Sequence, residues 1–210
     1  MINKIFKNFQ KKSRSSKFKL FLSQLNPDVS TKILDVGSGP GTFLEEKYKQ
    51  KKNITALDIS EEYLKLVKTR YPDVKIIKGN ALKLPFKDKS IDIIFSNAVI
   101  EHVGNYKKQK IFADEIRRVS KKYFVTTPNK HFPFEPHYRL PFYQWIPKKL
   151  QKKFSKFANI GNYKKGEWED INLLTPKKFK KLFPEAELVR HKILLFPETL
   201  ICVKKAVFYV

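Results

Sequence analysis

Cysteine, arginine and long apolar runs are all scarce in this chain of 210 residues. The single cysteine, Cys202, excludes an internal disulfide and any metal site built from several thiolates. No apolar run approaches the roughly 18 residues that a membrane-spanning helix needs. Met1–Phe9 also lacks the apolar core and small-residue cleavage site of a secretory signal. The sequence therefore predicts a cytoplasmic protein.

Positive charge is abundant, although arginine is not. The chain has 44 Lys and Arg against 20 Asp and Glu, a formal net charge of +24, and only six of the basic residues are Arg. The planar guanidinium of Arg is the better group for recognising phosphates and bases, whereas Lys acts as a point charge. Lys scattered over every segment is also what a codon-biased genome produces. The charge therefore favours attraction to anionic surfaces, lipid headgroups among them, over nucleic-acid recognition.

Apolar runs of strand length alternate with helix-compatible segments from Thr31 onward. The predicted strands are Lys32–Val36, Asn53–Asp58, Val74–Lys78, Ser90–Ser96, Lys122–Thr127, Glu187–Phe196 and Glu198–Lys204. The predicted helices are Thr42–Lys52, one that begins after an N-cap at Ser60, Tyr106–Val119 and Thr175–Phe183. Repeated β-α-β units of this length predict an α/β fold, a parallel sheet wound on both faces with ligands at the carboxyl ends of the strands.

Three glycines directly follow the first predicted strand. Gly37, Gly39 and Gly41 continue from Asp35 in the pattern D-x-G-x-G-x-G. Glycine accepts positive φ and allows a ligand to lie against bare backbone. The dinucleotide pattern G-x-G-x-x-G would need its third glycine at Thr42, and no G-x-x-x-x-G-K-[ST] phosphate loop is present. A nicotinamide oxidoreductase is disfavoured for this reason, and because no catalytic Tyr/Lys pair is evident.

Ile33–Phe43 resembles the first motif of class I, Rossmann-like S-adenosylmethionine-dependent methyltransferases, in particular the type 11, UbiE-like superfamily. The resemblance spans about Lys32–Thr127. It implies S-adenosylmethionine as the cofactor and a seven-stranded, mostly parallel, doubly wound sheet. The cofactor-binding residues that it implies are Asp35, Gly37, Ser38, Gly39, Gly41, Asp58, Ile59, Asn80, Ala81, Ser96 and Asn97.

The resemblance also implies how the parts of the cofactor are held. Asp58 ends the second predicted strand, where its carboxylate would accept hydrogen bonds from both ribose hydroxyls. Asn80 and Ala81 would lie against adenine. The family more often has Asp at the position of Asn80, but the amide oxygen can still accept from the adenine amino group. Ser96 and Asn97 would lie beside the methionine moiety.

Transfer of a methyl group to a hydroxyl requires removal of a proton. His102, just past the fourth predicted strand, is the candidate base because an imidazole titrates near neutrality. A structural role, in which the ring packs on the cofactor, is the alternative. A second cluster follows the fifth strand, where Glu135 and His137 lie among prolines and aromatic residues. The candidate catalytic residues are therefore His102, Glu135 and His137.

A metal site is an alternative role for His102 and a later histidine. Glu101-His102 with a later histidine resembles the metal site of small-RNA 2′-O-methyltransferases and some quinone-pathway O-methyltransferases, which carry Glu-x-x-Glu-His. Here Ala98 stands where the first Glu would be. Glu101, His102 and one of His131 or His137 would fill an oxygen-rich Mg²⁺ site poorly. The sequence therefore predicts no metal.

The regular alternation of predicted strands and helices ends after the fifth strand. The sequence predicts a basic extension at 1–26, one methyltransferase domain at 27–210, and within it a lid over the acceptor at 129–172. Between Glu135 and Glu167 there are eight basic residues and no acidic one. Apolar residues in the lid fall at approximately helical spacing, and a similar set begins the chain. These two sets are Trp145, Ile146, Leu150, Phe154 and Phe157, and Ile2, Ile5, Phe6 and Phe9.

Both segments allow two arrangements. They can pack their apolar side on the domain and leave the lysines in solvent, or they can lie on an anionic membrane surface.

The predicted function is methyl transfer, most simply to an oxygen, on a small or lipid-linked acceptor. The alternative of RNA 2′-O-methylation predicts a basic face around the cleft and strong salt dependence. A non-catalytic binding module is disfavoured by the intact glycine turn with Asp58.

Overall fold

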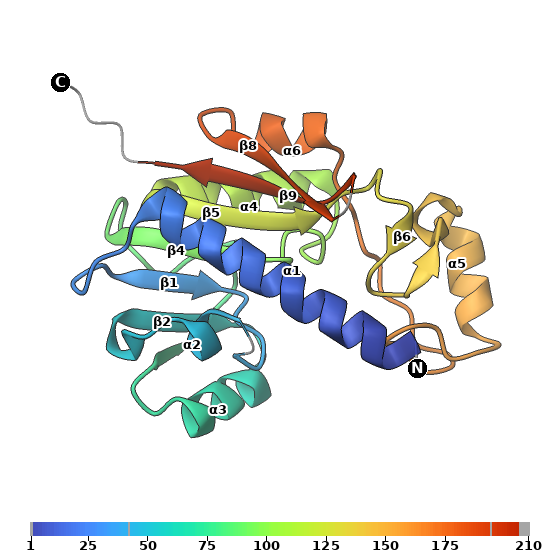
Figure 1. Cartoon of the computed structure of the whole chain (residues 1–210), viewed down its shortest axis with the longest axis horizontal. Helices are drawn as coiled ribbons and strands as arrows, with labels where there is room; N and C mark the ends of the chain where they lie inside the picture. Colours follow the sequence, from blue (N-terminus) through green and yellow to red (C-terminus); the bar gives the residue numbers. More distant parts are fainter. Residues whose placement is uncertain (1, 42, 194, 206–210) are drawn as a thin grey trace.

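The computed structural model describes residues 2–41, 43–193 and 195–205, although not the side chains of residues 2–11, 45 and 193. Its centre is a seven-stranded sheet with the strand order β3-β2-β1-β4-β5-β9-β8 (Figure 1). β1 to β5 pair in parallel, and β9 runs antiparallel to both β5 and β8. The predicted mostly parallel, doubly wound sheet is confirmed. The strands are β1 (Ile33–Val36), β2 (Ile54–Asp58), β3 (Lys75–Lys78), β4 (Ile91–Asn97), β5 (Ser120–Pro128), β8 (Glu187–Ile193) and β9 (Phe196–Lys204).

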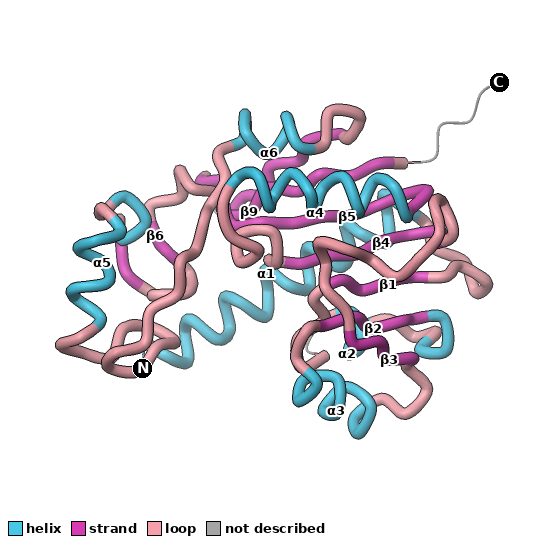
Figure 2. The backbone as a smooth tube through the Cα atoms, turned by 180° about the vertical axis from the view of Figure 1, so that it is seen from behind, coloured by secondary structure: helices cyan, strands magenta, loops and turns pink. Residues whose placement is uncertain are grey.

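Helices cover both faces of this sheet. α1 runs diagonally across one face, whereas α4 and α6 lie on the other (Figures 1 and 2). The helices are α1 (Ile2–Leu25), α2 (Leu44–Lys47), α3 (Glu61–Arg70), α4 (Tyr106–Val119), α5 (Lys148–Ser155) and α6 (Pro176–Leu182), with 3-10 turns η1 (Lys51–Asn53) and η2 (Tyr143–Trp145). The segment between β5 and α6, for which we keep the name lid, holds α5 and the small hairpin of β6 (Phe134–Glu135) and β7 (Leu140–Pro141).

Side-chain caps set the starts of three helices. Ser60 Oγ accepts a hydrogen bond from the Tyr63 N–H at 3.3 Å, which confirms the predicted cap of α3. Asn105 and Thr175 cap α4 and α6 in the same way. A side-chain oxygen at this position satisfies a backbone N–H that has no partner inside the helix. These caps fix the residues at which the three helices begin.

The predicted helix over Thr42–Lys52 is wrong. Among the described residues it shrinks to the four residues of α2 and the turn η1. Tyr48 ends α2 in an extended conformation, at φ −77° and ψ 131°. Its ring is thereby buried in the core, and its hydroxyl donates to the Asp28 carbonyl at 3.3 Å. A longer helix would carry this aromatic ring out of the core, and the burial of a large apolar group outweighs local helix propensity.

Aromatic packing attaches α1 to the sheet. The rings of Phe95 and Phe124 stack at 5.7 Å, and the fully buried Phe21 of α1 meets them edge-on at 5.3 and 5.6 Å. Phe43, the residue directly before α2, stacks its ring on that of Phe95 with the centroids 5.1 Å apart. Edge-on and offset contacts are the favourable geometries for aromatic pairs. The basic segment that the sequence sets apart at 1–26 therefore contributes buried side chains to the main core.

Replacing Phe21 tests this attachment. Phe21→Ala removes a fully buried aromatic ring, so we expect the free energy of unfolding in urea to fall by about 3–5 kcal/mol. The control is Lys19→Ala, an exposed position on the same helix, where the change should stay within about 0.5 kcal/mol. Equal losses for the two variants would contradict an anchoring role for the Phe21 ring.

Candidate active site

The glycine turn begins where β1 ends. The N–H of Gly37 donates to the Leu57 carbonyl at 2.8 Å and so ties the turn to β2. Gly37 has φ +73°, and a Cβ there would lie 2.4 Å from Val99 Cγ2. Gly39 also has positive φ, at +55°, but a Cβ there would meet no atom within 4 Å. The turn is therefore tight against Val99 at Gly37 and open at Gly39, as a ligand cradle requires.

Asp58 ends β2 and organises the rim of this cradle. One carboxylate oxygen accepts from the Gly39 N–H at 2.9 Å and the other from the Ser60 N–H at 2.8 Å. Each oxygen keeps a second lone pair, so that Asp58 can still accept from a pair of vicinal hydroxyls. At 9% exposure the side chain is almost enclosed by its surroundings. The geometry suits a ribose diol at this position.

A cavity of about 320 Å³ opens beside Asp58. It is lined by Gly37, Leu57, Asp58, Ile59, Gly79, Asn80, Ala81, Leu82, Val99, His102 and Val103. The structure thus brings together five of the residues expected to bind the cofactor, which are Gly37, Asp58, Ile59, Asn80 and Ala81. The mixture of an apolar wall and a carboxylate fits an adenosine group. Asn80 Oδ1 accepts from the Leu82 N–H at 2.9 Å, which fixes this corner.

The other expected cofactor residues do not line this cavity. Ser96 is fully buried, and its hydroxyl donates to the Val36 carbonyl at 2.9 Å. Asn97 Oδ1 accepts from Thr126 Oγ1 at 2.9 Å. These two side chains join neighbouring strands. The remaining residues lie at the end of β1 and in the turn that follows it, and they are Asp35, Ser38, Gly39 and Gly41.

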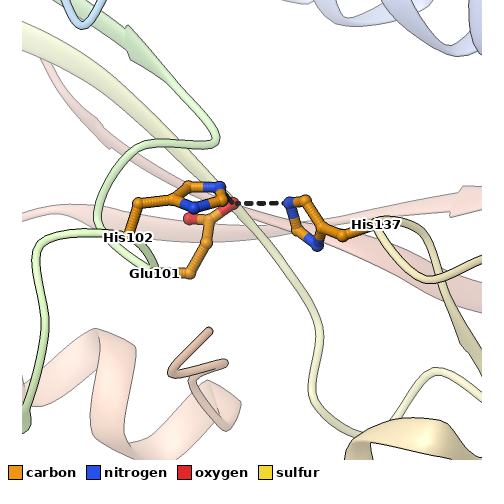
Figure 3. Close-up of side chains that lie close together, drawn as sticks. All are labelled: Glu101, His102 and His137. Carbon is orange, nitrogen blue, oxygen red and sulfur yellow. Dashed lines mark ion pairs between the residues drawn. The ribbon is translucent and has the colours of Figure 1, made fainter. Parts of the chain in front are cut away.

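Two histidines and a glutamate meet just past the end of β4. The Nε2 atoms of His102 and His137 each lie 3.9 Å from Oε1 of Glu101 (Figure 3). The two imidazole rings are 4.9 Å apart and nearly perpendicular. Glu101 has no exposed surface, and its Oε2 accepts from Thr127 Oγ1 at 2.9 Å. Of the two later histidines that the sequence offers as partners of Glu101, the structure brings His137 here and leaves His131 exposed on the lid.

Further carboxylates hold both imidazoles in place. His102 Nδ1 lies 2.6 Å from Glu169 Oε1, and His137 Nδ1 lies 2.7 Å from Glu135 Oε1. An ionised carboxylate only accepts hydrogen bonds, so each Nδ1 carries the proton and each Nε2 has a free lone pair when the ring is neutral. Glu135 is buried, and its Oε2 accepts from the Tyr138 N–H. Glu135 thus orients His137.

These contacts shift the pKa values of the cluster. Burial acts to lower the pKa of His102, but the hydrogen bond to Glu169 and the charges of Glu101, Glu169 and Glu135 outweigh it, and the pKa lies above its usual value. The hydrogen bonds from His102 and Tyr163 lower the pKa of Glu169 to about 2, against the effect of burial. The cluster as a whole favours positive charge near its centre.

A second cavity, of about 400 Å³, lies within the lid. It is lined by Lys130, Glu135, Tyr138, Tyr143, Gln144, Trp145, Ile146, Pro147, Lys148, Gln151, Ile171, Asn172 and Leu173. His102 lines the first cavity and Glu135 lines the second, and the contacts of His137 with both join the two. The polar cluster therefore connects the cradle beside Asp58 with the lid.

The apolar side chains of the lid helix face outward. On α5 the polar Gln151 and Ser155 are buried, whereas Leu150 and Phe154 are about half exposed. Gln151 donates to the carbonyls of Tyr143 and Ile146, which holds α5 in this orientation. Packing of this apolar side on the sheet, one of the two expected arrangements, does not occur. The side chains of the matching N-terminal set, Ile2, Ile5, Phe6 and Phe9, lie outside the described residues.

Sequence reasoning missed Glu169 and Tyr163, which support His102. Glu169 contacts a histidine 67 positions earlier in the chain, and Tyr163 OH donates to its other oxygen at 2.6 Å. Neither residue belongs to a motif, so no local pattern indicated them. Glu101 did carry a signal, because it directly precedes His102.

Known proteins share this fold and part of this sequence. Residues 34–123 match the family model described as a methyltransferase domain. A solved structure of a Methanosarcina mazei protein described as a SAM-dependent methyltransferase superposes with a TM-score of 0.61 at 18% identity, covering 90% of this chain and 97% of that one. Together with the glycine turn and the strand order, these matches show that residues 34–123 are similar to S-adenosylmethionine-dependent methyltransferase domains and that the chain has their fold.

Two curated relatives indicate the range of this class. The chain is 33% identical over 101 residues to a probable S-adenosylmethionine-dependent methyltransferase of Mycolicibacterium smegmatis, across 47% of this chain and 38% of that protein. It is 38% identical over 77 residues to a demethylmenaquinone methyltransferase of Renibacterium salmoninarum, across 37% of this chain and 32% of that protein. The chain thus matches less than half the length of either relative.

Replacing Asp58 tests the cofactor cradle. Asp58→Ala removes the acceptor for the ribose hydroxyls and the contact with the Gly39 N–H, so we expect the Kd for S-adenosylmethionine to rise about 10- to 100-fold in a calorimetric titration. Asp28→Ala is the matched control, because Asp28 also accepts a backbone N–H two residues on, but in an exposed loop. An unchanged Kd in Asp58→Ala would contradict this assignment.

Proposed function

We propose that this chain transfers the methyl group of S-adenosylmethionine to an oxygen of a small or lipid-linked acceptor that occupies the lid cavity. The observation that carries this proposal is the polar cluster that joins the two cavities. The cofactor supplies an electrophilic methyl group on a sulfonium. Gly37 and Asp58 would hold its adenosine part, with Asn80 and Ala81 against the adenine.

The cluster would act on the acceptor hydroxyl. The oxygen forms a bond to the methyl carbon, the carbon–sulfur bond breaks with its electron pair going to sulfur, and the hydroxyl proton leaves. His102 Nε2 and His137 Nε2 are suited to take or relay that proton, because the contacts of Nδ1 with Glu169 and Glu135 leave both Nε2 lone pairs free in the neutral rings. We assign Glu135 a positioning role, since both of its oxygens are engaged.

Replacing His137 tests the catalytic assignment. We expect His137→Ala to lower kcat by roughly 10²- to 10⁴-fold, the usual range for loss of acid–base assistance, with little change in the Kd for S-adenosylmethionine because His137 does not line the first cavity. His131→Ala is the matched control, an exposed histidine in the same segment. A His137→Ala variant as active as the control would contradict the assignment.

The acceptor can be sought directly with labelled cofactor. Protein, methyl-labelled S-adenosylmethionine and a cell extract are incubated, and label is measured in the organic-solvent, aqueous small-molecule and RNA fractions. We expect label in the organic-solvent fraction. A quinone is the acceptor named for one relative, and an aromatic-lined cavity of about 400 Å³ is the size of small-molecule sites. Label confined to RNA would contradict the proposal and support the 2′-O-methylation alternative.

The outward face of the lid supports peripheral contact with an anionic membrane. We name the exposed residues Phe142, Trp145, Leu150, Phe154 and Phe157 the lid apolar patch. Lys149, Lys152, Lys153 and Lys156 are exposed among them. Aromatic side chains interleaved with lysines suit the headgroup region of an anionic bilayer. No helix among the described residues is long and apolar enough to cross a membrane. The start of α1 lies beside this lid (Figures 1 and 2).

Vesicle binding tests this contact. We expect co-sedimentation with phosphatidylglycerol vesicles, weaker binding to phosphatidylcholine vesicles, and a clear loss on Phe154→Ser/Phe157→Ser. Ile111→Ser is the control, since Ile111 is an exposed apolar residue of α4 outside the patch. Each buried aromatic contributes on the order of 1.5–3 kcal/mol, so the double variant should bind at least 10-fold more weakly. Equal binding of wild type and the double variant would contradict a membrane role for the lid.

A further inference from the structure

The centre of the polar cluster lacks a group that its atoms are arranged to hold. Glu101, His102 and His137 each offer one ligand atom, and these three atoms all lie within 4.8 Å of one another. The Nε2 atom of each histidine is 3.9 Å from Glu101 Oε1 (Figure 3). Glu101 Oε1 is fully buried and accepts no hydrogen bond from the part of the chain that the structure describes. A buried carboxylate oxygen without a partner is costly, so such an atom normally faces a cation or a donor.

We propose that Glu101, His102 and His137 bind a divalent transition-metal cation, with zinc as the first candidate. The ligands come from two parts of the chain, the segment after β4 and the lid. Bonds of about 2.0–2.2 Å in a tetrahedral arrangement would place the ligand atoms about 3.4 Å apart. The two separations of 3.9 Å need to close by about 0.5 Å. The ligand atoms of the two histidines, which lie within 4.8 Å of each other, need to approach as well, and side-chain rotation can supply both movements.

The surroundings of the three ligands match those of metal sites. A histidine ligand characteristically donates its other ring N–H to a carboxylate or carbonyl, which fixes its tautomer and orientation. Both histidines do so here, to Glu169 and Glu135. The supporting groups are themselves held, since Tyr163 donates to Glu169 and the Tyr138 N–H donates to Glu135. Thr127 fixes the remaining oxygen of Glu101.

Charge also favours a cation. Three carboxylates, Glu101, Glu135 and Glu169, surround two imidazoles in a chain that is otherwise strongly basic. Lys17 of α1 lies close enough to interact electrostatically with Glu101, but among the described residues it forms no ion pair with it within 4 Å. A divalent cation between the two Nε2 atoms and Oε1 would balance this charge.

The ligand types select the class of metal. Mg²⁺ and Ca²⁺ prefer oxygen ligands, and Ala98 supplies none where a second carboxylate would stand. Two imidazole nitrogens and one carboxylate suit zinc, iron(II), cobalt(II) or manganese(II), and leave at least one position open. When the metal is bound, the two Nε2 lone pairs are not free to take a proton. An acceptor oxygen at the open position would then be polarised by the metal, in place of proton removal by the histidines. The sequence-based expectation of no metal considered an oxygen-rich magnesium site and a site of several thiolates, but not a transition-metal site of two imidazoles and one carboxylate.

Metal binding can be measured without cofactor or acceptor. Untagged, chelator-treated protein is titrated with zinc chloride in a calorimeter, and with cobalt chloride while the visible absorption is recorded. We expect one equivalent of zinc and a cobalt spectrum typical of low-coordinate nitrogen and oxygen ligation. Glu169→Gln should weaken zinc binding about 10- to 100-fold, the usual effect of losing a residue that orients a histidine ligand through its other ring nitrogen. His137→Ala removes a ligand itself and should weaken zinc binding more.

Two further variants complete the test. Glu101→Gln keeps the size of the side chain and an acceptor for the Thr127 hydroxyl, so the protein should still fold. Because this variant lacks the carboxylate ligand, we expect it to lose tight zinc binding. His131→Ala should bind zinc like the wild type. Two results would overturn the inference. In the first, the wild type binds zinc no tighter than His137→Ala does; in the second, His131→Ala also loses tight zinc binding. The result is independent of methyl transfer, since neither cofactor nor acceptor is present.

Discussion

Parallel pairing of β1 between β2 and β4 is the constraint on which the rest of the molecule depends. Asp35 pairs with Ala56 on one side and with Phe95 on the other, and both registers are parallel. Parallel strands end at a common edge, so the turn after β1 and the end of β2 must meet there. Gly37 and Asp58 therefore face the same cavity although they are separated in the chain. The helices and the lid only complete an edge that the sheet has already defined.

The buried carboxylate of Glu101 organises the polar cluster, the part of the site that the sheet edge does not define. Glu101 lies beside the end of β4, and its lid partners approach from a segment with little regular structure. The lid holds its shape through polar contacts, such as those of Gln151 with its own backbone neighbours and of Tyr138 with Glu169. Because these contacts satisfy the inside of the lid, its apolar side chains remain on the surface.

The sequence predicted the sheet more closely than the site. The seven strands follow from apolar runs and turn residues, and α4 begins and ends at the residues that its periodicity indicates. The failed helix over Thr42–Lys52 has a tertiary cause, because burial of Tyr48 ends it early. Ser96 and Asn97 were expected at the cofactor through the resemblance, yet their side chains bond to neighbouring strands. Their position at a strand end was right, but side-chain direction depends on contacts across the sheet.

By itself, the sequence determined the order of the elements and the glycine turn, because both rest on local spacing: a period of two or 3.6 residues, and glycines where positive φ is needed. Only the tertiary structure decided which histidine joins Glu101 and which carboxylates orient it. His131 and His137 are equivalent in the sequence, and Glu169 lies 67 positions from His102. Contacts of this kind depend on how a long loop folds back over the sheet, and no local pattern encodes that path.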